Sequence, residues 1–365
     1  MDRAILEASE RCAVFLPNFN HGRFLTYALD ALLAQSVPAH AIHVVDDGST
    51  DDSPRIIADY AARHPRILAR LHAENRGVVR RMSEWLAQAE AEFVLFAAAD
   101  DVVMPQLIER SLALLLAHPR AGLCSALTRL LDEDSSDLGP YDTPIPLRAS
   151  GYIPPEQAAQ ILMRDDSWFL GNTTIYRRAA LEPFGGFDPR LAGFSDGFVS
   201  RAIALAFGAC FIPCHLAYWR RMQAGFATQT LANAETARQV ADHAVALMEG
   251  PHRDVFPGGY AHRWRRRWIF GAAVACSREQ GRKGRTRSLN ALFGPDNAVK
   301  RLLLALLARV PSAVVSPLLL VVMRPWDVWS VLRRRVFRIG SLKARRSSPQ
   351  QANMRATRDS TRAGG

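Results

Sequence analysis

The stretch FVLFAAADDVVMP, residues 93–105, sets two adjacent carboxylates directly after an apolar run. The run FVLFAA is typical of a central strand in a sheet that is covered on both faces. Like charges side by side raise each other's cost of ionisation, so Asp100 and Asp101 need a positive partner. Two kinds of partner fit: the side chain of Arg80 or Arg81, or a metal ion that also holds a substrate. The stretch therefore predicts a buried strand that ends at a polar site.

The first half of the chain repeats this unit of an apolar strand followed by an amphipathic helix. Ser53 and Pro54 indicate one helix start, because serine is a frequent N-cap and proline fits the first helical turn. The predicted strands cover residues 12–16, 41–46, 66–71, 93–98 and 121–131, and the predicted helices cover 21–36, 53–64, 78–90 and 104–119. This order predicts an α/β fold, a three-layer α/β/α sandwich with a mostly parallel central sheet. Ligands of such sheets bind beyond the carboxyl ends of the strands.

The chain departs from this repeat after residue 131. Residues 132–155 are rich in acids, Pro, Gly and Ser, which predicts a long surface loop. After a short helix we expect a strand at 171–178, a helix at 195–208 and a strand at 209–216. These elements are expected to complete a site over the sheet edge, so that residues 1–225 form the first domain.

The positive charge is concentrated behind this domain. The chain has 365 residues, 48% of them hydrophobic, and a formal net charge of +11. Residues 262–287 are dense in arginine and contain one acid, Glu279. A basic balance favours a polyanionic partner, which is a nucleic acid, an anionic membrane surface or a phosphorylated substrate. We expect a helical, basic region over residues 226–340 and a disordered basic tail over residues 341–365.

Residues 302–323 form a long apolar segment with basic residues on both sides. Three interpretations stay open: helices that lie in the interface of an anionic leaflet, a membrane-spanning helix, or a helical cap. Arg309, Pro311 and Pro317 argue against a straight spanning helix. The interfacial interpretation is therefore favoured, and it makes the C-terminal region a peripheral membrane contact.

Aromatic and sulfur-containing side chains add two expectations. Trp264 and Trp268 share one helix face, which indicates either anchoring at a membrane interface or packing in a core. The five cysteines lack a CxxC pair and are expected to be buried structural thiols, typical of a reducing cytoplasm. The start of the chain carries an acid and no apolar stretch of signal-peptide length, which argues against export.

Polar residues follow three predicted strands at the same edge of the sheet. PNFN follows the first strand, DDGST the second and ADD the fourth. Asp46 and Asp47 admit two interpretations: a tight turn with a helix cap, or acceptors for the NH and hydroxyl groups of a nucleoside. Asp100 and Asp101 would coordinate a hard divalent cation, Mg²⁺ or Mn²⁺, together with substrate phosphates.

Five segments in this order and spacing resemble the family 2 glycosyltransferases of the GT-A fold: VFLPNFNHGRFLTYALDALLAQS, HVVDDGSTDDS, ENRGV, FVLFAAADDVVMP, and FGGFDPRL with SDGFVSRAIALAFG. The resemblance covers roughly residues 12–222. It implies an inverting enzyme that transfers a sugar from a nucleotide-diphosphate sugar to the hydroxyl of a saccharide or lipid-linked acceptor. The implied pathway is cell-surface polysaccharide or glycolipid biosynthesis. Together with the basic C-terminal region, this places the protein at the cytoplasmic face of the inner membrane.

The resemblance also implies roles for particular residues. The residues that line the nucleotide-sugar are Pro17, Asn18, Asp46, Asp47, Asn75 and Asp100. The metal-binding motif of the DxD type falls on Ala98, Ala99 and Asp100, so the metal would be held by Asp100 with help from Asp101. Asp196 matches the acid that serves as catalytic base, and Ser195 takes the place of the glutamate before it. On the residues alone, Asp196 would instead be the N-cap of a helix.

Two departures and three alternatives qualify this interpretation. Ala98 stands where the motif's first aspartate would be, and Ser83 stands where many relatives have asparagine. A GT-A-like nucleotidyltransferase should carry a Gly-rich phosphate loop, which PNFNHGRF does not resemble. A non-catalytic or degenerate nucleotide-sugar-binding protein would explain Ala98 as the sign of a decayed site. A specific nucleic-acid partner is not expected, because only the basic tail favours it. Arg220 and Arg221 could contact phosphate or serve packing alone.

Overall fold

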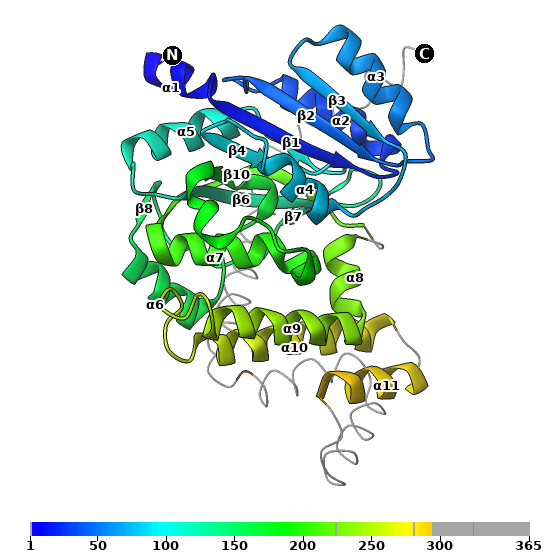
Figure 1. Ribbon diagram of the computed structural model, residues 1–365, viewed down its shortest axis with the longest axis vertical. Helices are drawn as coiled ribbons and strands as arrows, with labels where there is room; N and C mark the ends of the chain where they lie inside the picture. Colours follow the sequence, from blue (N-terminus) through cyan, green and yellow to red (C-terminus); the bar gives the residue numbers. More distant parts are fainter. Residues whose placement is uncertain (1, 223–224, 280–281, 294–323, 325–365) are drawn as a thin grey trace, which may run out of the picture.

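The computed structural model describes residues 2–222, 225–279, 282–293 and 324. Within these ranges ten strands form one sheet, with helices on both of its faces (Figure 1). The strands are β1 (Cys12–Asn18), β2 (Ala41–Asp47), β3 (Ile67–His72), β4 (Phe93–Phe96), β5 (Val102–Val103), β6 (Leu123–Leu131), β7 (Asp137–Pro140), β8 (Gly151–Ile153), β9 (Ile175–Arg177) and β10 (Ala209–Arg220).

The described helices fall into a group that covers the sheet and a group that follows it. The first group is α1 (Arg3–Ser9), α2 (Gly22–Leu33), α3 (Ser53–Arg63), α4 (Val78–Leu86), α5 (Leu107–Ala117), α6 (Pro155–Asp165) and α7 (Ser195–Phe207). The second group is α8 (Phe226–Ala232), α9 (Ala234–Glu249), α10 (Tyr260–Glu279) and α11 (Arg282–Phe293). Short 3₁₀ turns include η1 (Gly171–Thr173) and η4 (Pro189–Phe194), and both lie near the candidate site described below.

The sheet runs in the order β3-β2-β1-β4-β9-β6-β10-β5, with β7 beside β6 and β8 beside β10. The long strands pair in parallel: β1 with β2 and β4, β2 with β3, and β6 with β10. The short strand β9 lies antiparallel between β4 and β6. The predicted α/β sandwich with a mostly parallel central sheet is therefore confirmed.

Two hydrophobic cores hold the layers together, one on each face of the sheet. One core packs α1, α2, α3 and α5 against β1, β2 and β4. The apolar side chains along one face of α2 are all buried: Phe24, Leu25, Ala28, Leu29 and Leu32. The other core packs α4, α6 and α7 against the opposite face and continues into α9 and α10. The helical extension thus shares a core with the sheet.

Several boundaries differ from the sequence predictions. The segment 132–155 holds strands β7 and β8, because its backbone pairs with β6 and β10. The segment 171–178 begins with η1, so its strand is only Ile175–Arg177. The strand predicted at 209–216 continues to Arg220. Asp52, not Ser53, occupies the N-cap of α3.

The described part of the C-terminal region is mostly helical, in α8, α9, α10 and α11. Trp264 is 2% exposed and stacks on Phe194, so it serves core packing rather than membrane anchoring. In the part of the chain that the structure describes, no helix is both long and apolar enough to cross a bilayer. The apolar segment 302–323 and the tail 341–365 lie outside the described residues.

Candidate active site

The first polar cluster joins the carboxyl ends of β1 and β2. The amide of Asn18 donates to Asp46 over 2.7 Å, and Asp46 also accepts from the amide and the hydroxyl of Ser49. Asn18 is 2% exposed, and its carbonyl oxygen finds no hydrogen-bond partner among the described residues. A buried acceptor without a partner costs stability unless a ligand supplies a donor. The end of β1 therefore presents an acceptor suited to an NH or OH group.

Asp47 holds the turn that follows β3. Its carboxylate accepts from the amides of Arg76 and Gly77 and from Nε of Arg81, the last over 2.6 Å. Arg81 is 4% exposed and also pairs with Glu84. Asp47 therefore meets a structural need of the loop.

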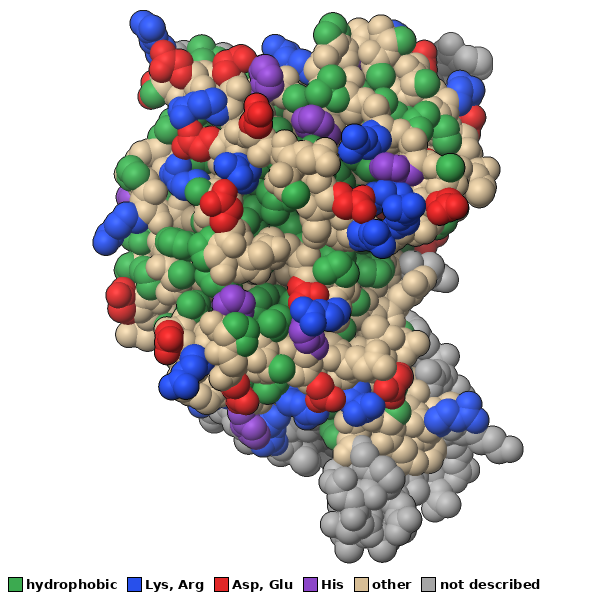
Figure 2. Space-filling model, viewed as in Figure 1, with side chains coloured by type: hydrophobic (Ala, Val, Ile, Leu, Met, Phe, Trp, Pro, Cys, Tyr) green, Lys and Arg blue, Asp and Glu red, His purple; other side chains and the backbone are tan. Residues whose placement is uncertain are grey.

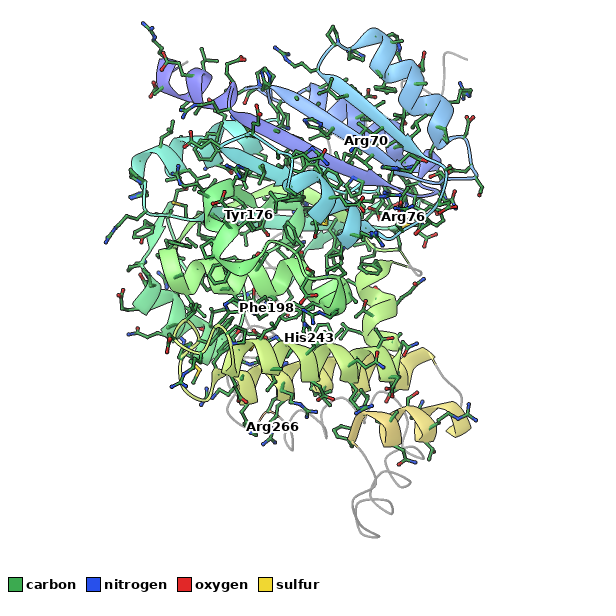
Figure 3. The ribbon with its side chains drawn as sticks, viewed as in Figure 1. Arg70, Arg76, Tyr176, Phe198, His243 and Arg266 are labelled. Carbon is green, nitrogen blue, oxygen red and sulfur yellow. The ribbon has the colours of Figure 1, made fainter. Side chains whose placement is uncertain are left out.

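The loop around Asn75 packs directly against the turn after β2. Gly48 has φ +77, and a Cβ at this position would lie 2.8 Å from the backbone nitrogen of Asn75. Only glycine combines this backbone conformation with so close an approach. Figure 3 shows the neighbouring Arg76 at the same end of the sheet. Pro17 lies in β1 beside Val45, one residue before Asn18.

The two aspartates after β4 differ in their surroundings. Asp101 is 7% exposed and accepts from the Arg220 amide and from Asn172, both over 2.9 Å. Burial, and then the adjacent Asp100, raise the pKa of Asp101 well above its usual value, while these hydrogen bonds and the Arg220 charge oppose the rise. Within the described residues nothing hydrogen-bonds the partly exposed Asp100 carboxylate. Asp100 is thus the acid available to a ligand.

The positive group near this acidic pair is Arg220, at the end of β10. Its Nε donates to the carbonyl of Asp100, and Nη1 donates to the carbonyl of Asp132 and the hydroxyl of Ser135. The guanidinium also lies 4.4 Å from the ring centroid of Phe24. Arg220 is 1% exposed, so it ties the acidic loop, α2 and the β6–β7 turn into one unit.

The structural partners proposed for Asp100 and Asp101 were wrong. Arg80 pairs with Glu84, and Arg81 pairs with Asp47 and Glu84. The partner Arg220 could not be predicted from the sequence, because it lies 120 residues after Asp100. The two residues come together only where β10 pairs with β5.

Asp196 lies in the first turn of α7, where the helix N-terminus favours negative charge. Its carboxylate accepts from the amide of Gly197 over 2.7 Å. Burial raises the pKa of Asp196 above the ordinary value of 3.8, against the effect of this hydrogen bond and of the Arg201 charge. A carboxylate held in this way is a better proton acceptor than an exposed one.

Two consecutive residues of η1 contact the two aspartates: Gly171 approaches Asp196, and Asn172 binds Asp101. A Cβ on Gly171 would lie 2.6 Å from Oδ2 of Asp196, so only glycine fits there without moving the carboxylate. The next residue, Asn172, donates to Asp101. Consecutive Cα atoms are about 3.8 Å apart, so η1 brings the start of α7 close to the acidic loop. Neither Gly171 nor Asn172 was predicted as a site residue, because both were assigned to the strand expected at 171–178.

Three of the described non-glycine residues with positive φ lie near the same edge: Asn20, Ser135 and Ala192. Four non-glycine residues have positive φ among those described: Asn20 (56°), Ser135 (64°), Asp166 (73°) and Ala192 (45°). Asn20 accepts from the amides of Thr50 and Asp51 beside the first cluster. Ser135 is held by Arg220, and Ala192 precedes Asp196 by four residues. Such conformations cost about 1–3 kcal/mol each and concentrate at functional sites.

A divalent cation fits the residues present, although they do not form a complete cage. No group of three or more His, Cys, Asp or Glu side chains in the described chain could hold a metal ion alone. Magnesium, however, is usually bound by one or two carboxylates together with substrate phosphates and water. Asp100 offers one carboxylate without a protein partner, and Asp101 lies beside it.

A separate cavity of about 680 Å³ opens on the α4 side of β1, β2 and β3. Its lining includes His43, Arg70, His72 and Trp85, while Asp100 and Asp196 do not line it. Figure 2 shows acidic, basic and histidine side chains together over this face. The cavity is therefore distinct from the acidic edge.

Comparison with known proteins identifies the domain. Residues 13–183 match the family model Glycosyl transferase family 2. An uncharacterized glycosyltransferase of Nostoc sp. is 27% identical over 213 residues, which cover 58% of this chain and 64% of that protein. Glycosyltransferase GlyG of Streptococcus pneumoniae is 31% identical over 28% of this chain and 34% of its own length. The matched parts thus span less than two thirds of these relatives.

Solved structures agree on the fold. The mannosyltransferase PcManGT of Pyrobaculum calidifontis, in complex with GDP-Man and Mn²⁺, has a TM-score of 0.52 at 19% identity and covers 88% of this chain and 83% of its own. Residues 1–349 of Staphylococcus aureus TarS, in complex with UDP-GlcNAc, have a TM-score of 0.53 at 18% identity and cover 81% and 90%. The resemblance seen in the sequence is confirmed: over residues 13–183 the chain carries a glycosyl transferase family 2 domain, with the GT-A fold.

Proposed function

We propose that this protein is an inverting glycosyltransferase, which transfers a sugar from a nucleotide-diphosphate sugar to an acceptor hydroxyl. The observation that carries the proposal is the link through η1. Gly171 lies against Asp196, and Asn172 binds Asp101 beside the free carboxylate of Asp100. Consecutive residues of η1 thus contact the two acids to which we assign proton acceptance, Asp196, and help in metal binding, Asp101. This is the pairing that a sugar-nucleotide displacement requires.

The donor would lie across the carboxyl ends of β1, β2 and β4. The unpaired carbonyl of Asn18 supports a contact with an NH or OH group of the nucleoside, with Pro17, Asp46, Asp47 and Asn75 around it. The structural neighbours bind GDP-Man with Mn²⁺ and UDP-GlcNAc. We extend to this chain the class they share, a nucleoside-diphosphate sugar.

Asp100, with help from Asp101, would hold Mg²⁺ or Mn²⁺ on the diphosphate. When bound, such an ion neutralises the charge of the leaving group. Ala98 carries no ligand atom, so the metal contact depends on the second half of the motif. Arg220 holds this loop in place, because its Nε donates to the backbone carbonyl of Asp100.

Asp196 would remove the proton from the acceptor hydroxyl as that oxygen attacks the anomeric carbon. Its raised pKa makes it a stronger base, and the hydrogen bond from the Gly197 amide stabilises its ionised form. Attack from the face opposite the leaving diphosphate inverts the anomeric centre. The nearby carboxylates would also favour the positive charge that develops on the sugar ring.

The acceptor is proposed to be a saccharide or a lipid-linked saccharide, in the assembly of a cell-surface polysaccharide or glycolipid. The protein would work at the cytoplasmic face of the inner membrane, through a peripheral contact of its basic C-terminal region. Fractionation of cells tests this location. A protein that remains wholly in the soluble fraction at low salt, with residues 300–340 intact, would contradict the membrane contact.

The activity is tested by donor turnover in Asp100→Asn and Asp196→Asn, with Arg238→Gln as a control on the surface of α9. GDP- and UDP-sugars are assayed with and without Mn²⁺, and the anomer of the product is read by NMR. We expect Asp196→Asn to lower kcat by about 10²–10⁴ with unchanged nucleotide binding. Asp100→Asn should instead abolish the effect of Mn²⁺ on nucleotide affinity.

Each alternative outcome has a definite meaning. Transfer that is unchanged in both variants would remove the proposed mechanism. Nucleotide-sugar binding without any turnover by the wild type would favour a degenerate binding protein. Retention of the anomeric configuration would exclude the inverting displacement.

A further inference from the structure

The segment that leads into Asp196 is held by helices that follow the sheet domain. It begins at Asp188, whose carboxylate binds Nε2 of His243 over 2.8 Å and Arg190 over 2.9 Å. Because an ionised carboxylate only accepts, His243 donates. Burial works to raise the pKa of Asp188, but the hydrogen bonds from Arg190 and His243 outweigh it and lower the pKa to about 2. Figure 3 shows His243 at the boundary between α9 and the sheet domain.

A second contact comes from α8, in the middle of the segment. The amide of Gly193 donates to the hydroxyl of Thr230 over 3.2 Å. A Cβ on Gly193 would lie 2.8 Å from Cα of Ala227, so backbone meets backbone at this point. Ala192, immediately before, has φ 45° and ψ −128°. This conformation is unfavourable for alanine, and its neighbours must hold it in place.

A third contact comes from α10, at the end of η4. The ring of Phe194 stacks on Trp264 with centroids 4.5 Å apart, and the guanidinium of Arg201 lies 5.1 Å from the Phe194 centroid. Arg201 also donates to the carbonyl of Gly197, directly after Asp196. Phe194 thus connects the core of the helical extension to the first turn of α7.

We propose that Thr230, His243 and Trp264 form a clamp that positions Asp196 for proton transfer, with His243 as a positioning residue. This inference rests on the proposed function, because it assigns the helical extension a part in the same reaction. His243 itself does not touch the reacting groups. It acts through Asp188 and η4, and removing its hydrogen bond would let the strained segment relax.

The physical expectation follows from the strain and from the partial burial of Asp196. A strained backbone relaxes when a hydrogen bond that restrains it is lost. Relaxation moves the carboxylate and admits water. Since burial is what raises the pKa of Asp196, with Arg201 and the Gly197 amide already opposing it, hydration shifts that pKa down.

The test compares His243→Leu, which removes the donor, with His243→Gln, whose amide can replace Nε2. Arg238→Gln is the matched control, because Arg238 also lies on α9 but, among the described residues, pairs only with Glu235 and Asp242 of its own helix. We expect His243→Leu to lower kcat about tenfold with a donor KM within twofold of wild type. The acid limb of the kcat profile should move to lower pH, and His243→Gln should restore both.

Hydrogen exchange provides a measurement that does not depend on turnover. Amides of residues 190–197 should exchange faster in His243→Leu than in Arg238→Gln, while those of β1 and β4 stay protected. Equal exchange in these two variants would overturn the proposal, as would an unshifted pH profile with kcat lowered equally in both. If His243→Leu does not fold, Thr230→Val carries the same comparison. Absence of turnover in the wild type would refute the proposed function, whereas the exchange result would still decide whether the clamp exists.

Discussion

Replacing Gly171 by alanine tests whether the position of Asp196 governs the rate. Gly171 lies in η1 without a positive φ, so alanine fits the backbone. The added Cβ, however, would lie 2.6 Å from Oδ2 of Asp196, where an ordinary contact needs at least 3.4 Å. The carboxylate must therefore retreat by about 0.8 Å. Because the atom displaced is the end of a side chain, we expect stability to change by less than about 1 kcal/mol.

The expected effect on the rate is much larger than the effect on stability. A displacement of about 1 Å in a catalytic group costs on the order of a hundredfold. A hundredfold loss in kcat corresponds to about 2.7 kcal/mol in the activation free energy. Nucleotide binding should be unchanged, because Gly171 contacts Asp196 and not the ends of β1 and β2.

The assay measures kcat for sugar transfer, the Kd of the nucleoside diphosphate, and the melting temperature. Gly258→Ala is the matched control, because no atom of the described residues lies within 4 Å of a Cβ at that position. A kcat of Gly171→Ala within twofold of Gly258→Ala would refute the assignment of Asp196 as a base whose position matters. A parallel loss of nucleotide binding would instead indicate damage to the whole edge.

Two further predictions concern stability. Arg81→Met should lower the free energy of unfolding in urea by about 3–5 kcal/mol, because it leaves the buried carboxylate of Asp47 without its cation. Arg80→Met breaks an exposed pair with Glu84 and should lower it by less than about 1 kcal/mol. Equal losses in the two variants would contradict the buried pairing. The pKa of Asp188 falls from 3.8 to about 2 on folding. Its contribution to stability is therefore complete above about pH 4 and lost as pH falls through about 2. After discounting for solvent screening, Asp188→Asn should lower the free energy of unfolding by about 1 kcal/mol at neutral pH and leave it unchanged at about pH 2. A difference in stability between variant and wild type that did not change with pH would refute the linkage.

The elements of the first half could be predicted because their signals are local. Runs of five or six residues indicated β1, β2 and β4, and the amphipathic pattern of residues 21–36 predicted α2. The antiparallel strands β7, β8 and β9 were missed or misplaced. They are short, and they pair because distant strands present edges to them, which no local pattern records.

The same contrast between local and distant signals applies to the candidate site. The sequence by itself determined that Asp46 and Asp100 stand near the carboxyl ends of strands and that Asp196 stands at the start of a helix, since the apolar patterns of these elements are local. Only the tertiary structure decided their partners. Arg81 binds Asp47 instead of the acidic pair, and Arg220 comes to that pair across 120 residues of chain. The side chain that satisfies a buried charge is chosen by proximity in the folded sheet, and the spacing along the chain does not determine it.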